Sequence, residues 1–109
     1  MKPLVLILID NLAERMALRS LLNTSGCMVT ACGTVQGARD TLRRRAFDLA
    51  LLDAELPDGS GVLLVRELKA DPQTANMLTV LLSPTASRDE ARADPERRAD
   101  AYAQKPYTH

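Results

Sequence analysis

The sequence is poor in features that several classes of protein require. It has one histidine, His109, and two cysteines, Cys27 and Cys32, so a Cys/His metal site has too few ligands. Its longest wholly apolar run, residues 4–9, is too short for a membrane-spanning helix or for the core of a signal peptide. Its net charge is zero, which leaves no broad basic field for nucleic acid phosphates. We therefore expect a cytoplasmic protein that neither enters a membrane nor binds nucleic acid directly.

The composition describes one ordinary folded domain. The 109 residues are 46% hydrophobic and 26% charged, which suits a single core. Cys27 and Cys32 lie five positions apart in an expected strand, so their side chains should point to opposite faces of a sheet. That geometry argues against a disulfide between them, and both are expected to be reduced packing residues.

Short apolar segments alternate with amphipathic segments along the chain. We expect strands at residues 4–9, 27–32, 49–53, 77–82 and 101–104. Continuous apolar runs such as the first are typical of strands in a parallel sheet that is covered on both faces. Helices are expected at residues 12–22, 35–46 and 62–69, with a fourth after Ser87. This alternation predicts an α/β fold, a doubly wound, five-stranded parallel sheet with helices on both faces.

Local signals describe the expected helices further. Asn11 and Ser60 have the side chains that suit the N-caps of the first and third helices. In the first helix, the apolar side chains expected to face the sheet are Met16, Ala17, Leu21 and Leu22. The basic run Arg43, Arg44 and Arg45 is expected to be the solvated end of the second helix.

Four polar side chains stand at the ends of expected strands. Asp10, Asp53, Ser83 and Lys105 end the first, third, fourth and fifth strands in turn. In an open parallel sheet the ligand site lies outside the carboxyl ends of the strands, so we expect these groups to share one crevice. The crevice would then hold two carboxylates, a hydroxyl and an ammonium.

These groups favour phosphoryl chemistry. Two converging carboxylates repel each other, and oxygen ligands of this kind favour Mg²⁺. A hydroxyl and an ammonium opposite them would bind the oxygens of a transferred phosphoryl group. Asp53 is the expected nucleophile, since it sits centrally, a Gly-rich loop follows it, and aspartyl phosphates are known covalent intermediates.

At this point the motifs resemble those of a known family. "LLDAELPDGSG", "VLLSPT" and "AYAQKPY", in this order, are similar to the receiver domain of two-component response regulators, and the resemblance covers residues 4–107. It implies a flavodoxin-like sheet of strand order 2-1-3-4-5 in a single receiver-like domain, residues 1–109. The chain stops soon after the fifth strand, so we expect a truncation that omits the fifth helix and makes a homodimer plausible.

The resemblance also implies a role for each matching residue. Asp53 would accept a phosphoryl group from a histidine kinase or phosphotransfer protein and would bind Mg²⁺ together with Asp10 and the backbone carbonyl of Glu55. The other implied roles are a switch hydroxyl, a switch aromatic and a phosphate-binding cation, at Ser83, Tyr102 and Lys105. The domain would be a signalling switch rather than an enzyme, and the peptide bond from Lys105 to Pro106 would be cis.

The sequence departs from the family pattern at several positions. Receivers usually have two adjacent acids after the first strand, and here the first of these positions is Ile9, which would weaken Mg²⁺ binding. Pro84 follows Ser83 and has no backbone N–H to give to a phosphoryl oxygen. Pro95 would interrupt the fourth helix, and Arg98 stands where a glycine is common, so the output face is altered as well.

Each candidate residue also has a structural alternative. Asp53 could cap the turn that follows it, and Asp10 could cap the first helix. Serine before proline commonly starts a turn, and a lysine in a loop is commonly solvated. The residues with these alternatives are Ser83 and Lys105, while Tyr102 could be half-buried packing and Glu55 an exposed loop charge.

Three functions follow from these observations. The first is a phosphorylatable receiver that switches between two states. The second is a degenerate receiver that acts as a phosphorylation-independent protein-interaction module, which Ile9 and Pro84 favour. The third is an enzyme, either a phosphohydrolase or a flavin-binding protein. The turn after the first strand has no glycines for close phosphate approach, and no Asp-x-Asp-x-Thr pattern follows Asp53, which argues against this third class.

Overall fold

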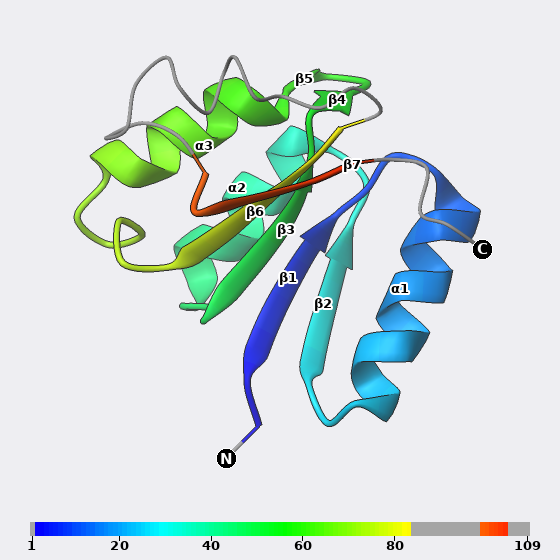
Figure 1. The fold of residues 1–109 in the computed structure, drawn as a ribbon. Coiled ribbons are helices and arrows are strands. Elements are labelled where there is room, and N and C mark those ends of the chain that lie inside the picture. The colour runs from blue at the N-terminus through cyan, green and yellow to red at the C-terminus, as the bar shows by residue number, and fades with distance from the viewer. Residues whose placement is uncertain (1, 84–98, 105–109) are drawn as a thin grey trace.

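The computed structural model describes residues 2–83 and 99–104, and its main element is a five-stranded sheet (Figure 1). The strands of this sheet are β1 (Leu4–Leu8), β2 (Met28–Cys32), β3 (Leu49–Asp53), β6 (Leu78–Ser83) and β7 (Ala101–Gln104). The described helices are α1 (Leu12–Thr24), α2 (Val35–Arg44) and α3 (Gly61–Ala70). A separate hairpin of two very short strands, β4 (Glu55–Leu56) and β5 (Gly59–Ser60), lies between β3 and α3.

The order of the large sheet is β2-β1-β3-β6-β7, and all of its strand pairs are parallel. Counted by position in the sheet, β6 and β7 are its fourth and fifth strands, so the predicted order 2-1-3-4-5 is confirmed. Each crossover between parallel strands passes through a helix where the structure describes the connection. The hairpin was not predicted, because strands of two residues have no periodicity to detect.

The central strand β1 explains why the sheet forms. Residues 5–9 are at most 1% exposed, so an uninterrupted run of aliphatic side chains is buried on both faces. Leu6 and Leu8 pack into the core cluster that includes α2 and α3, whereas Val5, Ile7 and Ile9 pack into the cluster that includes α1. This alternation between faces is the period of two that a strand imposes.

The two cysteines divide between these faces in the same way. Cys27 packs against the cluster on the α1 side, and Cys32 packs against the cluster on the α2 and α3 side. Both are free thiols, which confirms the prediction that they are reduced packing residues.

The apolar stripe predicted for α1 is wrong in part. Met16 and Leu21 are 61% and 62% exposed, and the leucines that pack against the sheet are Leu18 and Leu22. Each helical residue advances the side chain by about 100°, so Met16 and Leu22 point about 120° apart and cannot share a narrow face. Positions four apart share a face, and Leu18 and Leu22 are such a pair.

The helix boundaries follow their capping groups. Asn11 Oδ1 accepts the N–H of Glu14 at 2.9 Å, and Ser60 Oγ accepts the N–H of Leu63 at 3.4 Å, so both predicted N-caps are confirmed. α2 ends at Arg44, two residues before the predicted end, because Arg45 already has extended backbone angles.

The fourth helix predicted after Ser87 lies outside the described residues. Among the helices that the structure describes, none has the length and apolar character needed to cross a membrane.

The edge strand β7 is fixed at its start by a network of polar side chains around Asp100. Asp100 Oδ2 accepts hydrogen bonds from Lys69 Nζ at 2.7 Å, from the Thr79 N–H at 2.8 Å and from Thr79 Oγ1 at 3.2 Å. Lys69 belongs to α3 and Thr79 to β6, so one carboxylate joins three elements. Lys69 Nζ also donates to the Met77 carbonyl, and its side chain is only 14% exposed.

We expect the Lys69 and Asp100 pair to stabilise the fold only where Asp100 is ionised. Burial raises the pKa of Asp100, but the hydrogen bonds from Lys69 and Thr79 outweigh burial and hold this pKa below its ordinary value. A depressed folded-state pKa gives a contribution that is complete above the unfolded value, about 3.9, and is lost as the pH falls through the folded value.

A double-mutant cycle of Lys69→Met and Asp100→Asn, followed by urea unfolding, measures this contribution. The coupling at pH 7 should be below about 1 kcal/mol, because Asp100 is substantially exposed and solvent screens the pair. It should be smaller at pH 3. A coupling of equal size at both pH values would contradict the assignment.

Candidate functional site

Two of the predicted site residues end neighbouring strands. They lie where the carboxyl ends of the strands meet, and we call this side of the sheet the acid edge. Asp53 is the last residue of β3 and Ser83 the last of β6, and their exposed fractions are 3% and 6%. Asp53 is paired in register with Leu82, so Ser83 lies one residue beyond that pair. A buried carboxylate and a buried hydroxyl therefore stand at the carboxyl ends of adjacent parallel strands, where ligands bind in open α/β sheets.

Asp10 joins this edge from the segment that follows β1, two residues after the strand ends. Its backbone N–H donates to Asp53 Oδ2 at 2.9 Å, across 43 residues of sequence. Asp10 is exposed, whereas Asp53, which accepts its N–H, is buried. The structure thus brings together the two acids that the sequence analysis placed in one crevice.

Arg15 fixes the segment that carries Asp10, and the sequence analysis did not identify it. Its Nη1 donates to the Ile9 carbonyl at 2.8 Å and to the Asp10 carbonyl at 3.3 Å. The same guanidinium nitrogen lies over Gly33, 2.5 Å from the point where a Cβ would stand at that position. A side chain at position 33 would therefore collide with Arg15, and Gly33 leaves the room that the arginine occupies.

The loop after Asp53 closes tightly on the end of β3. The Ala54 carbonyl accepts the N–H of Gly61 at 2.8 Å, and a Cβ at position 61 would overlap the backbone of Asp53. Only glycine allows this approach. The "PDGSG" segment is therefore compact, and Gly61 at its end packs against the backbone of Asp53.

Asp58 ties this loop to α2. Its carboxylate accepts the N–H of Val35 at 2.7 Å and that of Gln36 at 3.1 Å, at the start of the helix. The backbone N–H of Val35, followed by that of Gln36, lowers the pKa of Asp58 below its ordinary value. An ionised side chain at a helix N-terminus is stabilised in the same way by the helix dipole.

The remaining predicted site residues are placed as follows. Glu55 lies on the short strand β4 with its side chain exposed, which agrees with the structural alternative for that side chain. Tyr102 is half-buried against the core cluster on the α2 and α3 side and is paired in register with Leu81. Lys105 lies outside the described residues, as do Pro84, Pro95, Arg98 and Pro106, so their predicted contributions stay predictions.

Ile9 is a core residue in this structure. It is fully buried with Val5, Ile7 and Leu82, and its N–H donates to the Cys32 carbonyl at 3.1 Å. Where receivers usually place the first of two acids, this chain therefore has an aliphatic side chain that stabilises the α1 side of the sheet.

The donor set at this edge fits a hard divalent cation with few protein ligands. Asp10 and Asp53 offer carboxylate oxygens, which Mg²⁺ prefers, and Mg²⁺ usually keeps several waters and needs only one or two carboxylates. Within the described part of the chain, no group of three or more His, Cys, Asp or Glu residues could hold a metal ion. A cation here would thus depend on two carboxylates, backbone oxygen and water.

The sequence of this chain matches a known protein family over nearly its whole length. The family described as "Response regulator receiver domain" matches residues 5–109. This chain belongs to that family. The receiver is 33% identical over 103 residues to the KDP operon transcriptional regulatory protein KdpE of Escherichia coli. The aligned region covers 94% of this receiver and 44% of KdpE. It spans less than half the length of the curated relatives it matches.

Solved structures show the same fold as this receiver. The chemotaxis response regulator CheY4 of Vibrio cholerae aligns with a TM-score of 0.89 at 19% identity, over 99% of this chain and 90% of that one. The receiver domain of the sensor histidine kinase PA1611 from Pseudomonas aeruginosa aligns with a TM-score of 0.84 at 21% identity, over 99% and 88% of the two chains. That structure has a magnesium ion coordinated in its active site cleft.

We expect Arg15→Ala to loosen the Asp10 segment while the domain stays folded. The variant removes a charged donor from the Ile9 and Asp10 carbonyls, and such hydrogen bonds contribute roughly 1.5–3 kcal/mol. Amide hydrogen exchange at Asp10, measured by NMR, should therefore become at least about tenfold faster. Arg19→Ala, on an exposed position of the same helix, is the control and should leave this rate unchanged. Equal exchange at Asp10 in both variants would show that Arg15 does not hold the segment.

Proposed function

We propose that this receiver is a phosphoacceptor of a two-component phosphorelay and that Asp53 is the residue modified. The observation that carries the proposal is the position of Asp53, which is buried at the end of β3 and accepts the N–H of Asp10, while Ser83 ends the adjacent strand β6. Membership of the receiver family supports the same function. The partner would be a histidine kinase or a phosphotransfer protein.

The transfer itself requires a nucleophile and a leaving group. An oxygen of the Asp53 carboxylate would attack the phosphorus of a phosphohistidine, forming a P–O bond as the P–N bond breaks. The electron pair of the broken bond stays on the imidazole nitrogen. In this chain, the Asp10 N–H holds Asp53 Oδ2, and the Gly61 contact fixes the backbone behind it, so the nucleophile is oriented before the donor arrives.

Asp10 and Asp53 would hold the Mg²⁺ that this chemistry uses, with the Glu55 backbone carbonyl as the further ligand suggested by the resemblance. The bound cation would offset the negative charge of the carboxylates and of the incoming phosphoryl group. Ser83 would contact a phosphoryl oxygen through its hydroxyl, and Lys105 would supply the neutralising ammonium. Tyr102 would respond to the modified state from its position on β7.

A phosphorylation-independent interaction module is the second candidate. The specific observation that favours it is Ile9, which is fully buried in the core and leaves the cation one carboxylate fewer than receivers usually have. Losses of this kind around a metal typically cost 10 to 100-fold in affinity or activity. Measurement of phosphorylation separates the two candidates.

We expect wild-type protein incubated with acetyl phosphate and Mg²⁺ to gain one phosphoryl group in intact-mass measurement. Asp53→Asn should gain none, because an amide cannot serve as the nucleophile. Asp48→Asn is a suitable control, since Asp48 ends the segment before β3, away from the site edge, and should be modified like wild type. No adduct in wild type at saturating donor would favour the interaction module.

We expect Pro84→Ala to accelerate phosphorylation of Asp53. The substitution restores a backbone N–H directly after Ser83, and one such donor contributes roughly 10² to 10³ in rate in a well-studied oxyanion site. A rise of about tenfold to hundredfold should be seen in the rate of adduct formation from acetyl phosphate. Pro72→Ala restores an N–H in an exposed loop and is the matched control. If both variants react at the wild-type rate, the missing donor does not limit the reaction.

A further inference from the structure

A concave surface lies at the edge of the sheet opposite Asp10 and Asp53, where the strands begin. It is a cavity of about 500 Å³ lined by residues 42–48, 73, 74, 76 and 77, and we call it the arginine groove. It lies between the end of α2 and the loop that follows α3. A smaller cavity of about 160 Å³ shares four of these residues and extends the groove between α2 and α3. Neither cavity contains Asp10, Asp53 or Ser83.

The lining of the groove combines an apolar floor with a basic rim. Phe47 and Met77 are buried core residues that form part of the lining, together with Leu42. Three arginines and one aspartate are the charged residues of the lining, although the chain as a whole has no net charge. The aspartate is Asp48, whose carboxylate already accepts the Leu4 N–H at 2.8 Å. The groove therefore carries a local excess of positive charge.

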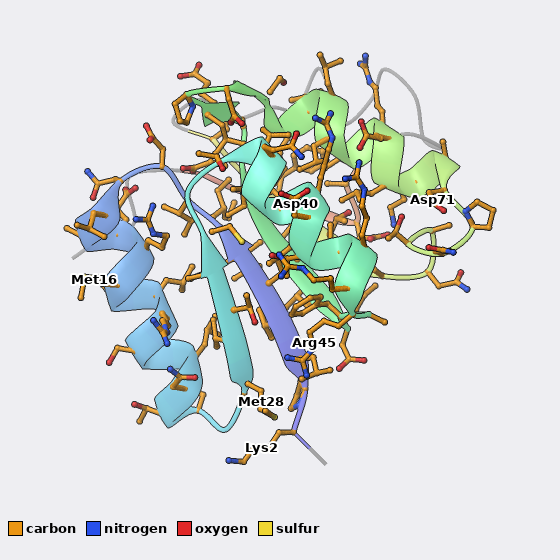
Figure 2. All side chains as sticks on the ribbon, turned by 180° about the vertical axis from the view of Figure 1, so that it is seen from behind. Lys2, Met16, Met28, Asp40, Arg45 and Asp71 are labelled. Carbon is orange, nitrogen blue, oxygen red and sulfur yellow. The ribbon has the colours of Figure 1, made fainter. Side chains whose placement is uncertain are left out.

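Two of the arginines have no acidic partner among the described residues. Arg43 Nη1 pairs with Asp40 at 3.3 Å, whereas Arg44 donates only to the Asp40 backbone carbonyl. Arg45 lies over the ring of Phe47, with its guanidinium carbon 5.8 Å from the ring centre. Figure 2 shows Arg45 at the end of α2, beyond Asp40 along the helix. Arg44 and Arg45 are thus the charges available to a ligand.

The arrangement of the arginines decides what kind of anion fits. Arg43 and Arg44 are successive helical positions, which point about 100° apart, and Arg45 has already left the helix. Side chains that leave the backbone in different directions favour several carboxylates spaced along an extended chain over a single phosphate. The floor of Phe47, Met77 and Leu42 offers a place for an apolar side chain between such carboxylates.

We propose that the arginine groove binds an acidic peptide segment of a partner protein, with one apolar side chain on Phe47 and Met77 and carboxylates on Arg44 and Arg45. The proposal rests on charge complementarity and does not depend on phosphorylation of Asp53. The alternative role for these arginines is to complement the negative end of the α2 dipole, which would stabilise the helix without any ligand.

A random dodecapeptide library displayed on phage and selected on the immobilised chain tests the proposal. The enriched peptides should be acidic and should carry a large apolar side chain. A fluorescein-labelled copy of one of them should bind at least about tenfold more weakly to the Arg44→Glu, Arg45→Glu double variant, because rim charges are reversed. Binding should also weaken between 50 and 500 mM salt, because salt screens exposed charges.

The matched control is the Arg19→Glu, Arg66→Glu double variant, which changes the net charge equally at exposed positions outside both cavities. It should bind the peptide like wild type, and NMR shifts caused by the peptide should center on Leu42, Phe47 and Met77. Equal weakening in both double variants, enrichment of peptides that are not acidic, or shifts elsewhere would overturn the proposal. So would inorganic pyrophosphate shifting these residues while no acidic peptide is enriched, since that outcome indicates a phosphate site.

Discussion

The structure depends on the complete burial of β1. Its aliphatic side chains pack into both core clusters, and β2 and β3 pair with its two edges. A strand buried on both faces needs cover above and below, and its parallel neighbours supply this cover because their crossovers place helices on both faces. The carboxyl ends of the strands must then meet at one edge. Asp10 and Asp53 become neighbours because of this topology, although 43 residues separate them.

Backbone groups, together with the Arg15 side chain, then hold the acid edge in place. Asp53 Oδ2 accepts an N–H from Asp10, Arg15 binds the carbonyls of the Asp10 segment, and the loop behind Asp53 closes through the Gly61 N–H. The Asp10 and Gly61 N–H groups belong to the backbone, which the sheet and the loop already order, so they orient the Asp53 carboxylate at small additional entropic cost. Ile9 stands where receivers usually have an acid, and in this chain it contributes to core packing instead.

The parts of the fold that repeat along the sequence could be predicted, and the parts that depend on single contacts could not. The strands follow from apolar patterns that extend over several residues, and the caps at Asn11 and Ser60 follow from polar residues placed just before such patterns. The strand order was implied by the resemblance to receivers. The apolar stripe of α1 was misassigned because leucines and a methionine occur on several sides of that helix, and only packing selects Leu18 and Leu22. Arg15 gave no signal, since an arginine in a helix is ordinarily solvated, and its hydrogen bonds depend on the room left by Gly33.

The two edges of the sheet are far enough apart to act separately. Phe47 in the groove lies two residues before β3, and Asp53 ends that strand, so the five residues of β3 alone separate the two edges by about 16 Å. Arg44 and Arg45 are exposed to solvent, where the Debye length at physiological ionic strength is about 8 Å, so their charges would act only weakly on a group at the other edge. Coupling between the edges would have to be mechanical and would need an element with two packed arrangements. The strands that join the edges are tightly packed and continuously paired, so a peptide in the arginine groove would leave the Asp53 edge open to a phosphoryl donor.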